Sequence, residues 1–584
     1  MELNIAEKGN QEQGEDNEAF ESQVCEIFEY SLDLRLKDII HINSKFVSGF
    51  VAMVIAACVL NFHQAVGLLV ISLVTMFFLV WDWMMERYSD WVWEALAPIR
   101  VALTRNWFWI RWIIYMLLLV AVVCWLALDT AQRGTRQLVS FFGLLLFIFL
   151  MLLFSKHPFR VRHWCWRTLL CGTGLQFIFG LLILRTTSGL SALKWLGKQA
   201  EGIDCGFSAG DAYIGFLSSV ISILYYVGFM PWLICKIGFI MQVTMGTSAT
   251  ESMAAAGNIF LGNTDSPLLI RPYIRELTVS EIHAVMTGGF ASISGTILGA
   301  FISFGVEASH LLTASLMSAP ASLAIAKMFW PEKEASIKIF HHDLKMDKGQ
   351  NVLEAASQGA SRAVGLVANI IVNLIAFLAL LAFFDAVLSW LGGMLDCPQL
   401  SFSLICSYVF MPLSFMMGVS WEDSFIVAEL IGIKTFLNEF VAYQKLSELI
   451  KRRKAGGPEY VNHVKQYISV HSETIATYAL CGFSNFAALG MSIGGLSAMA
   501  PDRRSDISSC GRRALIAGSV SCFMTACIAG DSLDSVIQHE CFCICSVTVY
   551  EPWNVTAGEG FSQSSLQGCC TLIPPKHFNC SWAL

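Results

Sequence analysis

The sequence predicts an all-α, polytopic membrane protein with about eleven transmembrane helices, two re-entrant hairpins and an inverted repeat with broken helices. Three observations support this fold class. Of the 584 residues, 55% are hydrophobic and only 14% are charged, whereas about 25% are charged in a soluble globular chain. Apolar runs recur at the length that crosses a bilayer. Two further apolar segments are interrupted by glycine, proline and polar residues.

The first 45 residues are predicted to form a disordered cytoplasmic tail. They are rich in Glu, Gln and Asn, and they have neither the basic n-region nor the apolar h-region of a signal peptide. The formal net charge of −7 comes largely from this acidic segment. No basic patch indicates nucleic acid as a partner. The expected surroundings of the remaining chain are therefore the lipid bilayer.

Eleven apolar runs approach or exceed the roughly 17 residues of a short membrane span. They cover residues 46–62, 65–83, 112–128, 138–154, 169–184, 213–235, 282–304, 311–329, 363–390, 472–498 and 514–529. After the tail (1–45), the predicted order is N-terminal transmembrane helices (46–135), scaffold helices (136–240), a first repeat of a transport domain (241–330), an inter-repeat loop with a long scaffold helix (331–402), a second repeat (403–530) and a C-terminal tail (531–584).

The lysine and arginine bias of the loops predicts a cytoplasmic N-terminus. In that orientation the cytoplasmic loops carry Arg87, Arg100, Arg105, Arg111, Lys156, Arg160, Arg162, Arg167, Lys236, Arg503, Arg504, Arg512 and Arg513. An odd number of crossings then places the C-terminus outside. The run Lys451-Arg-Arg-Lys454 also falls outside and disagrees with this topology.

The C-terminal tail is predicted to be extracellular, glycosylated and cross-linked by disulfides. It contains acceptor sequons at Asn554 and Asn579 and an even number of cysteines in a polar setting. A metal site built on its Cys-x-Cys spacing is the alternative. The cysteines are Cys541, Cys543, Cys545, Cys569, Cys570 and Cys580.

Two segments, 241–273 and 403–450, are predicted to be re-entrant hairpins, entering from the cytoplasm and from outside respectively. Such interrupted backbone is tolerated at membrane depth only where it lines a cavity or is buried in protein. Each hairpin is followed by a span with a polar break, at 289–295 and at 482–488. The matching order and opposite entry sides describe an inverted repeat, which places a solute site near the bilayer midplane.

Each hairpin segment carries an acid at the expected membrane depth, Asp265 in the first and Glu439 in the second. An acid at the membrane centre costs at least ~2.5 kcal/mol and therefore requires a partner or a function. One interpretation is a structural ion pair, for example between Glu439 and Lys434. The other is that both carboxylates accept hydrogen bonds from a polar solute or help to hold a cation.

Four residues are candidates for a sodium shell: Asn258, Leu261, Ser292 and Ile293. Sodium is a hard cation that prefers oxygen ligands, which amide, hydroxyl and unwound backbone carbonyl groups supply. The alternative for Asn258 and Ser292 is interhelical hydrogen bonding. In the second break, Asn485 can bind a sugar hydroxyl and Phe483 can give an apolar face to a ring, although core packing is the default role of a phenylalanine.

Long motifs in this order resemble those of the concentrative nucleoside transporters, in particular the vertebrate branch. The similarity extends over residues 47–529. The motifs are Ala256-Gly-Asn-Ile-Phe-Leu-Gly-Asn-Thr-Asp-Ser-Pro-Leu-Leu-Ile-Arg-Pro-Tyr273, Leu311-Leu-Thr-Ala-Ser-Leu-Met-Ser-Ala-Pro-Ala-Ser322, Phe415-Met-Met-Gly-Val419, Asn438-Glu-Phe-Val-Ala-Tyr443 and Tyr478-Ala-Leu-Cys-Gly-Phe483.

The resemblance implies sodium-driven nucleoside uptake at the plasma membrane by a homotrimer whose transport domain moves like an elevator. No cofactor is implied beyond the co-transported sodium ion. The base would be held by Asn263, Thr264 and Asp265, and the ribose by Glu439 and Asn485 beside Phe483. Sodium would lie among Asn258, Leu261, Ser292 and Ile293. Gly262 and Thr296 resemble the purine-preferring members.

This sequence also departs from the family pattern. Asn263 and Asp265 have shorter side chains than the residues usual at these positions, and Ala488 replaces a ribose-binding serine. The chain is shorter than family members between Gly202 and Leu217. A transport-deficient variant of the family is therefore one alternative. An intramembrane enzyme using Asp265 and Glu439 is another, although the chain has no known hydrolase motif. A passive channel would require a continuous polar lining.

Overall fold

The computed structural model describes residues 44–60, five single positions between 69 and 87, and residues 135–157, 165–184, 210–263, 265–332, 351–394, 400–456, 458–461 and 464–550. The chain divides into two compact units, one at residues 30–133 and the other formed mainly by residues 134–584. In the first unit, α2 (Ser44–Leu60) forms at the first expected span. The spans expected at 65–83 and 112–128 lie, apart from single positions, outside the described residues.

In its described residues the larger unit is helical, apart from two short strands, β1 (Tyr460–Val461) and β2 (Val464–Lys465). These strands pair antiparallel, with Tyr460 opposite Lys465. The first two helices of this unit, α6 (Thr135–Leu153) and α7 (Cys165–Leu184), form where the fourth and fifth apolar runs predict them.

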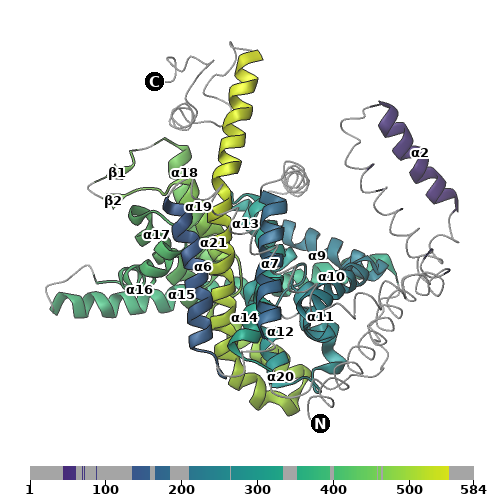
Figure 1. Ribbon diagram of the computed structural model, residues 1–584, viewed down its shortest axis with the longest axis horizontal. Helices are drawn as coiled ribbons and strands as arrows, with labels where there is room; N and C mark the ends of the chain where they lie inside the picture. The colour runs from purple at the N-terminus through teal and green to yellow at the C-terminus, as the bar shows by residue number, and fades with distance from the viewer. Residues whose placement is uncertain are drawn as a thin grey trace, which may run out of the picture. The chain divides into compact units, whose positions relative to one another are not determined.

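The element order of this unit repeats once (Figure 1). The first series is α9 (Gly210–Val227), α10 (Phe229–Met245), α11 (Ala249–Gly257), η3 (Ser266–Tyr273), α12 (Val279–Ala291), α13 (Gly295–Ser303) and α14 (Ala308–Phe329). The second is α15 (Val352–Met394), α16 (Phe402–Met416), α17 (Trp421–Phe436), α18 (Glu439–Lys454), α19 (Val470–Leu480), α20 (Phe486–Met499), η4 (Pro501–Arg503) and α21 (Arg504–Tyr550). Each series contains two short helical arms joined by a turn, a broken helix and a final long helix.

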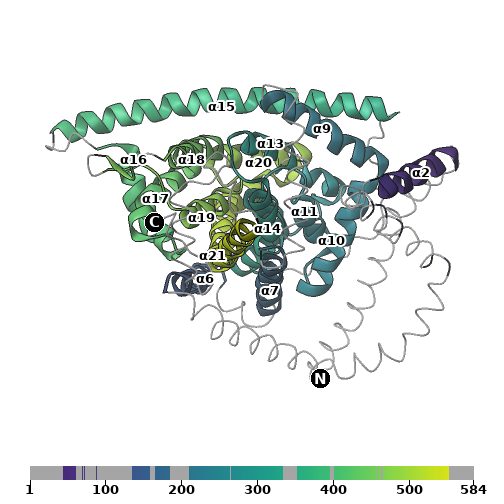
Figure 2. The same ribbon diagram turned by 90° about the horizontal axis from the view of Figure 1, so that it is seen from above.

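The final helices of the two series form the centre of the core. In the most apolar windows of α14 and α21, 89% and 78% of the residues are buried, against 39% for α7. α12 and α19 pack against both α14 and α21. The long α15 runs along one side with α9 packed against it (Figure 2). Phe383 and Trp390 of α15 are largely exposed, which is the composition expected of a lipid-facing helix.

Three described helices are long and apolar enough to cross a bilayer, namely Trp166–Leu184, Ala308–Phe329 and Pro501–Gly530. Two bent pairs also pass this test as pairs, Ser218–Val227 with Phe229–Met245 at 79° and Phe402–Met416 with Trp421–Phe436 at 118°. These features are those of a multi-pass membrane protein. Two further expected spans, 282–304 and 472–498, are each divided by a break, between α12 and α13 and between α19 and α20.

Three of the expected boundaries are wrong. The single span expected at 213–235 ends at Val227, because Gly228 has a φ of 92°, which turns the chain into α10. The paired helical arms are also shorter than the segments expected to form the hairpins. Residues 241–245 belong to α10, and residues 403–416 form the separate helix α16, so the paired arms begin at Ala249 and at Trp421. The local apolar pattern does not mark these ends because it continues through each bend.

Candidate functional site

The polar breaks of the two series meet in the core. The backbone N–H of Phe483, in the second break, donates to the carbonyl oxygen of Ser292, in the first, at 3.2 Å. The turn of the first hairpin joins them, because Gly295 N–H donates to Phe260 O at 3.0 Å. The structure therefore brings together the three segments that the sequence singled out separately.

Gly482 allows the two breaks to approach. Its φ is 148°, and a Cβ at this position would lie 2.6 Å from Cys522 Sγ and 2.8 Å from Phe290 O. A real Cβ does not approach backbone that closely. Glycine is therefore needed here both for space and for conformation.

Glu439 and Asn485 form a buried pair from different elements. Asn485 Nδ2 donates to Glu439 Oε2 at 2.7 Å, and both side chains are almost fully buried. Asn485 is also the N-cap of α20, because its Oδ1 accepts from the backbone N–H of Ala488 at 2.7 Å. The cap fixes the amide so that its N–H faces the carboxylate. Phe483, expected beside this pair, is 9% exposed.

The structure does not form the ion pair between Glu439 and Lys434 that the sequence left open. Lys434 is buried in the last turn of α17, and its ammonium donates instead to the carbonyl oxygen of Ala479 at 2.9 Å. A cation at the carboxyl end of α19 is favourable, because the helix dipole places partial negative charge there.

Asn258 is a buried amide without a hydrogen-bond partner. It is the C-cap of α11, its side chain is 1% exposed, and neither Nδ2 nor Oδ1 has a partner within the protein. The amide lies against α12, where a Cβ on Gly288 would be 2.7 Å from Asn258 Nδ2. A buried amide that is left unsatisfied is costly. Its environment therefore suits a ligand that binds oxygen.

The other residues expected to form a sodium shell lie at the ends of the same helices. Leu261 and Ile293 are buried, and they follow α11 and α12 respectively. Ser292 Oγ donates to Gly288 O at 2.9 Å, and the Ser292 carbonyl accepts from Phe483. Each of these oxygens can still accept one further interaction. The donor set fits a hard cation such as sodium.

The remaining predicted site residues lie near this region in different settings. Gly262 is buried, and a Cβ there would be 3.4 Å from Ser294 Cβ and 3.7 Å from Asp265 Oδ2. Asn263 packs against α12, where a Cβ on Gly289 would meet Asn263 Oδ1. Asp265 is exposed, in contrast to Glu439. Thr264, the side chain of Thr296, and the sequon residues Asn554 and Asn579 lie outside the described residues.

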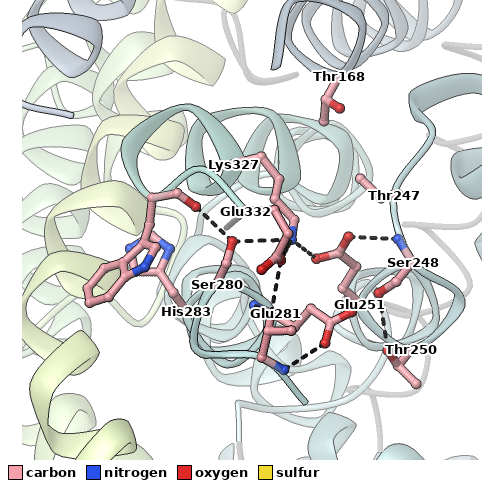
Figure 3. Close-up of polar contacts among 12 residues, drawn as sticks. Thr168, Thr247, Ser248, Thr250, Glu251, Ser280, Glu281, His283, Lys327 and Glu332 are labelled. Carbon is pink, nitrogen blue, oxygen red and sulfur yellow. Dashed lines mark hydrogen bonds and ion pairs between the residues drawn. The ribbon is translucent and has the colours of Figure 1, made fainter. Parts of the chain in front are cut away.

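Sequence reasoning missed a second polar cluster (Figure 3). Lys327, in the last turn of the apolar α14, forms an ion pair of 2.7 Å with the buried Glu251 of α11. The available signals were a lysine at the end of an apolar run and the Ser-x-x-Glu pattern from Ser248 to Glu251, which is typical of a capping box.

Two interrupted repeats whose broken helices meet at a buried polar site define a secondary transporter of the multi-pass membrane class. Three family models cover most of the chain: Na+ dependent nucleoside transporter N-terminus at residues 142–210, Nucleoside recognition at 212–308 and Na+ dependent nucleoside transporter C-terminus at 310–530. The chain belongs to the sodium-dependent, or concentrative, nucleoside transporter family, solute carrier family 28. It is a transporter rather than an enzyme, so the intramembrane-enzyme alternative is set aside.

Similar proteins extend over nearly the whole chain. Solute carrier family 28 member 3 of Eptatretus stoutii is 53% identical over 94% of this chain and 86% of its own length. The human protein of that name is 53% identical over 92% and 83%. Sodium/nucleoside cotransporter 2 of Mus musculus is 47% identical over 82% and 75%.

Solved structures of CNTnw also match this fold. An inward-facing, substrate-bound state has a TM-score of 0.62 and 34% identity, and it covers 68% of this chain and 98% of CNTnw. An outward-facing variant of the same protein has a TM-score of 0.62 and 33% identity over the same shares.

Proposed function

We propose that this chain is a sodium-coupled symporter that imports nucleosides across the plasma membrane, with a leaning toward purine nucleosides. The observation that carries the proposal is the contact between the two helix breaks, which brings the Glu439 and Asn485 pair next to the end of α12. In secondary transporters with inverted repeats, solute and coupling ion bind where such interrupted helices meet.

The sodium ion would be held by oxygens of Asn258, Leu261, Ser292 and Ile293. The unpartnered amide of Asn258 supports this assignment, because a bound cation would satisfy its oxygen. The carboxyl ends of α11 and α12 add partial negative charge from the helix dipoles. A monovalent ion can then be bound without a carboxylate in direct contact.

The nucleoside would bind between the two breaks. Glu439 and the oriented amide of Asn485 suit ribose hydroxyl groups, which both donate and accept. Phe483 would lie against the sugar. Asn263, Thr264 and Asp265 would hydrogen-bond the base, whose pocket Gly262 and Thr296 would shape. The exposed Asp265 would become covered when substrate or hairpin closes over it.

Transport would follow an elevator-type alternating-access mechanism. The two paired arms would be re-entrant hairpins, which move with the broken helices against the scaffold helices α9 and α15. The driving force is adequate, since one cation that crosses a ~100 mV potential releases about 2.3 kcal/mol. That supports roughly fifty-fold accumulation of solute at about 1.4 kcal/mol per tenfold ratio.

The proposed assembly is a homotrimer of about eleven-span subunits with a cytoplasmic N-terminus. The C-terminus would then be extracellular, with glycans on Asn554 and Asn579.

Uptake of labelled uridine and inosine in a transporter-null cell tests the proposal. The expected result is accumulation above equilibrium that requires sodium, with inosine competing more strongly than uridine. Sodium-independent equilibration would indicate a channel and overturn the proposal. A version with a family-length segment between Gly202 and Leu217 is measured in parallel. Uptake by that version alone would identify this chain as a transport-deficient variant.

A further inference from the structure

A buried ammonium joins three elements near the start of the first hairpin. Lys327 Nζ lies 2.7 Å from Glu251 Oε2, 3.1 Å from Glu332 Oε2 and 3.3 Å from Ser280 Oγ (Figure 3). Glu251 belongs to α11, Ser280 to α12 and Lys327 to α14. We call these four residues the lysine cluster.

The lysine cluster lies at the amino ends of α11 and α12. Each helix starts with a capping box, formed by Ser248 with Glu251 and by Thr278 with Glu281. Thr278 Oγ1 also donates to Glu332 at 2.9 Å. Both helix starts are therefore tied to the same cation, directly or through Glu332.

The opposite ends of α11 and α12 form the proposed sodium shell. Asn258 caps α11 and lies against Gly288 in the last turn of α12. Asn258 follows Glu251 by seven positions, and Gly288 follows Glu281 by seven. At 1.5 Å per residue, each helix advances about 10.5 Å from the glutamate of its capping box to the shell. The two helices are thus parallel and in register.

This register leaves little freedom for sliding. A slip of one residue would move Asn258 by about 1.5 Å along α12. The amide packs at Gly288, where α12 lacks a side chain and a Cβ would be 2.7 Å from Nδ2. The position of α11 along the axis of α12 therefore determines whether Asn258 Oδ1 and the carbonyls at the end of α12 can reach one ion.

We propose that Lys327 is a positioning residue for sodium coupling. Its ammonium holds α11 at the position along the α12 axis where the sodium ligands converge. It acts through Glu251 and Ser280 and does not touch the ion or the nucleoside. The inference rests on the proposed function, since it takes the sodium shell as given.

The test measures the sodium concentration for half-maximal nucleoside uptake, together with the nucleoside KM at saturating sodium and the amount of protein at the cell surface. We expect Lys327→Met to raise the sodium requirement by roughly tenfold, a coupling change of ordinary size. The nucleoside KM at saturating sodium should stay within about twofold of the wild type. Lys327→Arg, which keeps the charge, should recover most of the sodium affinity.

Lys445→Met is the matched control. Lys445 forms an ion pair of 2.8 Å with Glu429 in the second hairpin, where both side chains are partly exposed. This variant should leave the sodium requirement unchanged. If Lys327→Met lowers only the amount of protein at the surface and keeps wild-type sodium dependence, Lys327 is merely structural and the proposal is wrong.

A double variant is measured in case Lys327→Met does not reach the membrane. Glu251→Gln with Lys327→Met removes both charges, so no carboxylate of that pair is left buried without its counter-charge. It should reach the surface with a raised sodium requirement, and wild-type dependence would overturn the proposal. Asn258→Ala tests the shell independently. If it leaves sodium dependence intact, the shell assignment fails, whatever Lys327 does.

Discussion

Asn485 shows how one residue can serve both the fold and the proposed site. The amide oxygen of Asn485 caps α20, and the amide nitrogen donates to Glu439. The cap holds the side chain in one orientation, so the carboxylate receives a fixed donor on one side. A carboxylate has further lone pairs, which can accept from a ligand.

Asn485→Ser separates these two roles. Serine is a good N-cap, so α20 should still form, but the donor to Glu439 is lost. Hydrogen bonds to charged groups contribute about 1.5–3 kcal/mol, which corresponds to a roughly 10- to 150-fold rise in the nucleoside KM. Concentration-dependent uptake, normalised to surface protein, measures the change. An unchanged KM would remove Asn485 from the proposed ribose site.

Ala488→Ser should strengthen nucleoside binding. Ala488 is buried in the first turn of α20, at the position where the family resemblance implies a ribose-binding serine. A restored hydrogen bond contributes about 0.5–1.5 kcal/mol, so we expect the nucleoside KM to fall by roughly 2- to 12-fold. Ala487→Ser, one position earlier, is the control and should leave KM unchanged. Equal effects of the two substitutions would contradict the assignment.

At the scale of the elements, each hairpin begins with a capped helix whose acid pairs with a lysine. In the second hairpin, Asp423 lies in the first turn of α17, accepts from Ser469 Oγ at 2.9 Å and pairs with Lys465 at 2.7 Å. Burial alone would lower the pKa of Lys465, but its hydrogen bond to Asp423 raises it well above its usual value. Ser469 is the N-cap of α19, so its hydrogen bond to Asp423 ties the start of α17 to the start of the broken helix.

The crossing of the two breaks depends on Gly482. Gly482→Ala would place a methyl group against Cys522 and the carbonyl of Phe290, in a backbone conformation that alanine rarely adopts. We expect a loss of about 1–3 kcal/mol in stability and a loss of uptake. Thermal unfolding of the detergent-purified protein measures the first. Gly490→Ala in α20, where a Cβ meets nothing within 4 Å, should leave the melting temperature equal or higher. If both variants melt alike, the close approach at Gly482 is not a constraint.

At the scale of the whole molecule, the two series contribute residues from both halves of the chain to one proposed site. α14 and α21 form the buried centre, and the broken helices α12 and α19 pack on both of them. Phe483 of the second series donates to Ser292 at the end of α12. Ion binding at that end of α12 would therefore also affect the second series. On the proposed function, sodium and nucleoside would be coupled through the contact between the breaks.

Sodium should accordingly stabilise the whole fold. A ligand that binds only the folded state at 100 times its Kd adds about 2.7 kcal/mol. The melting temperature of the purified protein should therefore rise with sodium and stay constant with choline at equal ionic strength. Asn258→Ala should abolish most of the rise. A full sodium-dependent shift in that variant would place the ion elsewhere.

The sequence by itself determined the class of fold and the starts of four helices. Apolar runs fixed the membrane setting, and the caps Thr278, Ser420, Asn438 and Asn485 start helices through bonds to residues at most three positions away. The interrupted segments also marked where the helices break. These signals are readable because they depend only on near neighbours in the chain.

Only the tertiary structure decided which of these segments touch. Phe483 meets Ser292, Asn485 rather than Lys434 meets Glu439, and Lys327 pairs with Glu251. Each contact joins helices that return to one another after long excursions, so the partner is set by how the helices pack and not by spacing. A lysine at the end of an apolar helix has several acids within its reach in sequence terms. The tertiary packing adds the buried Glu251 to the partly exposed Glu332, because a carboxylate away from water needs a counter-charge.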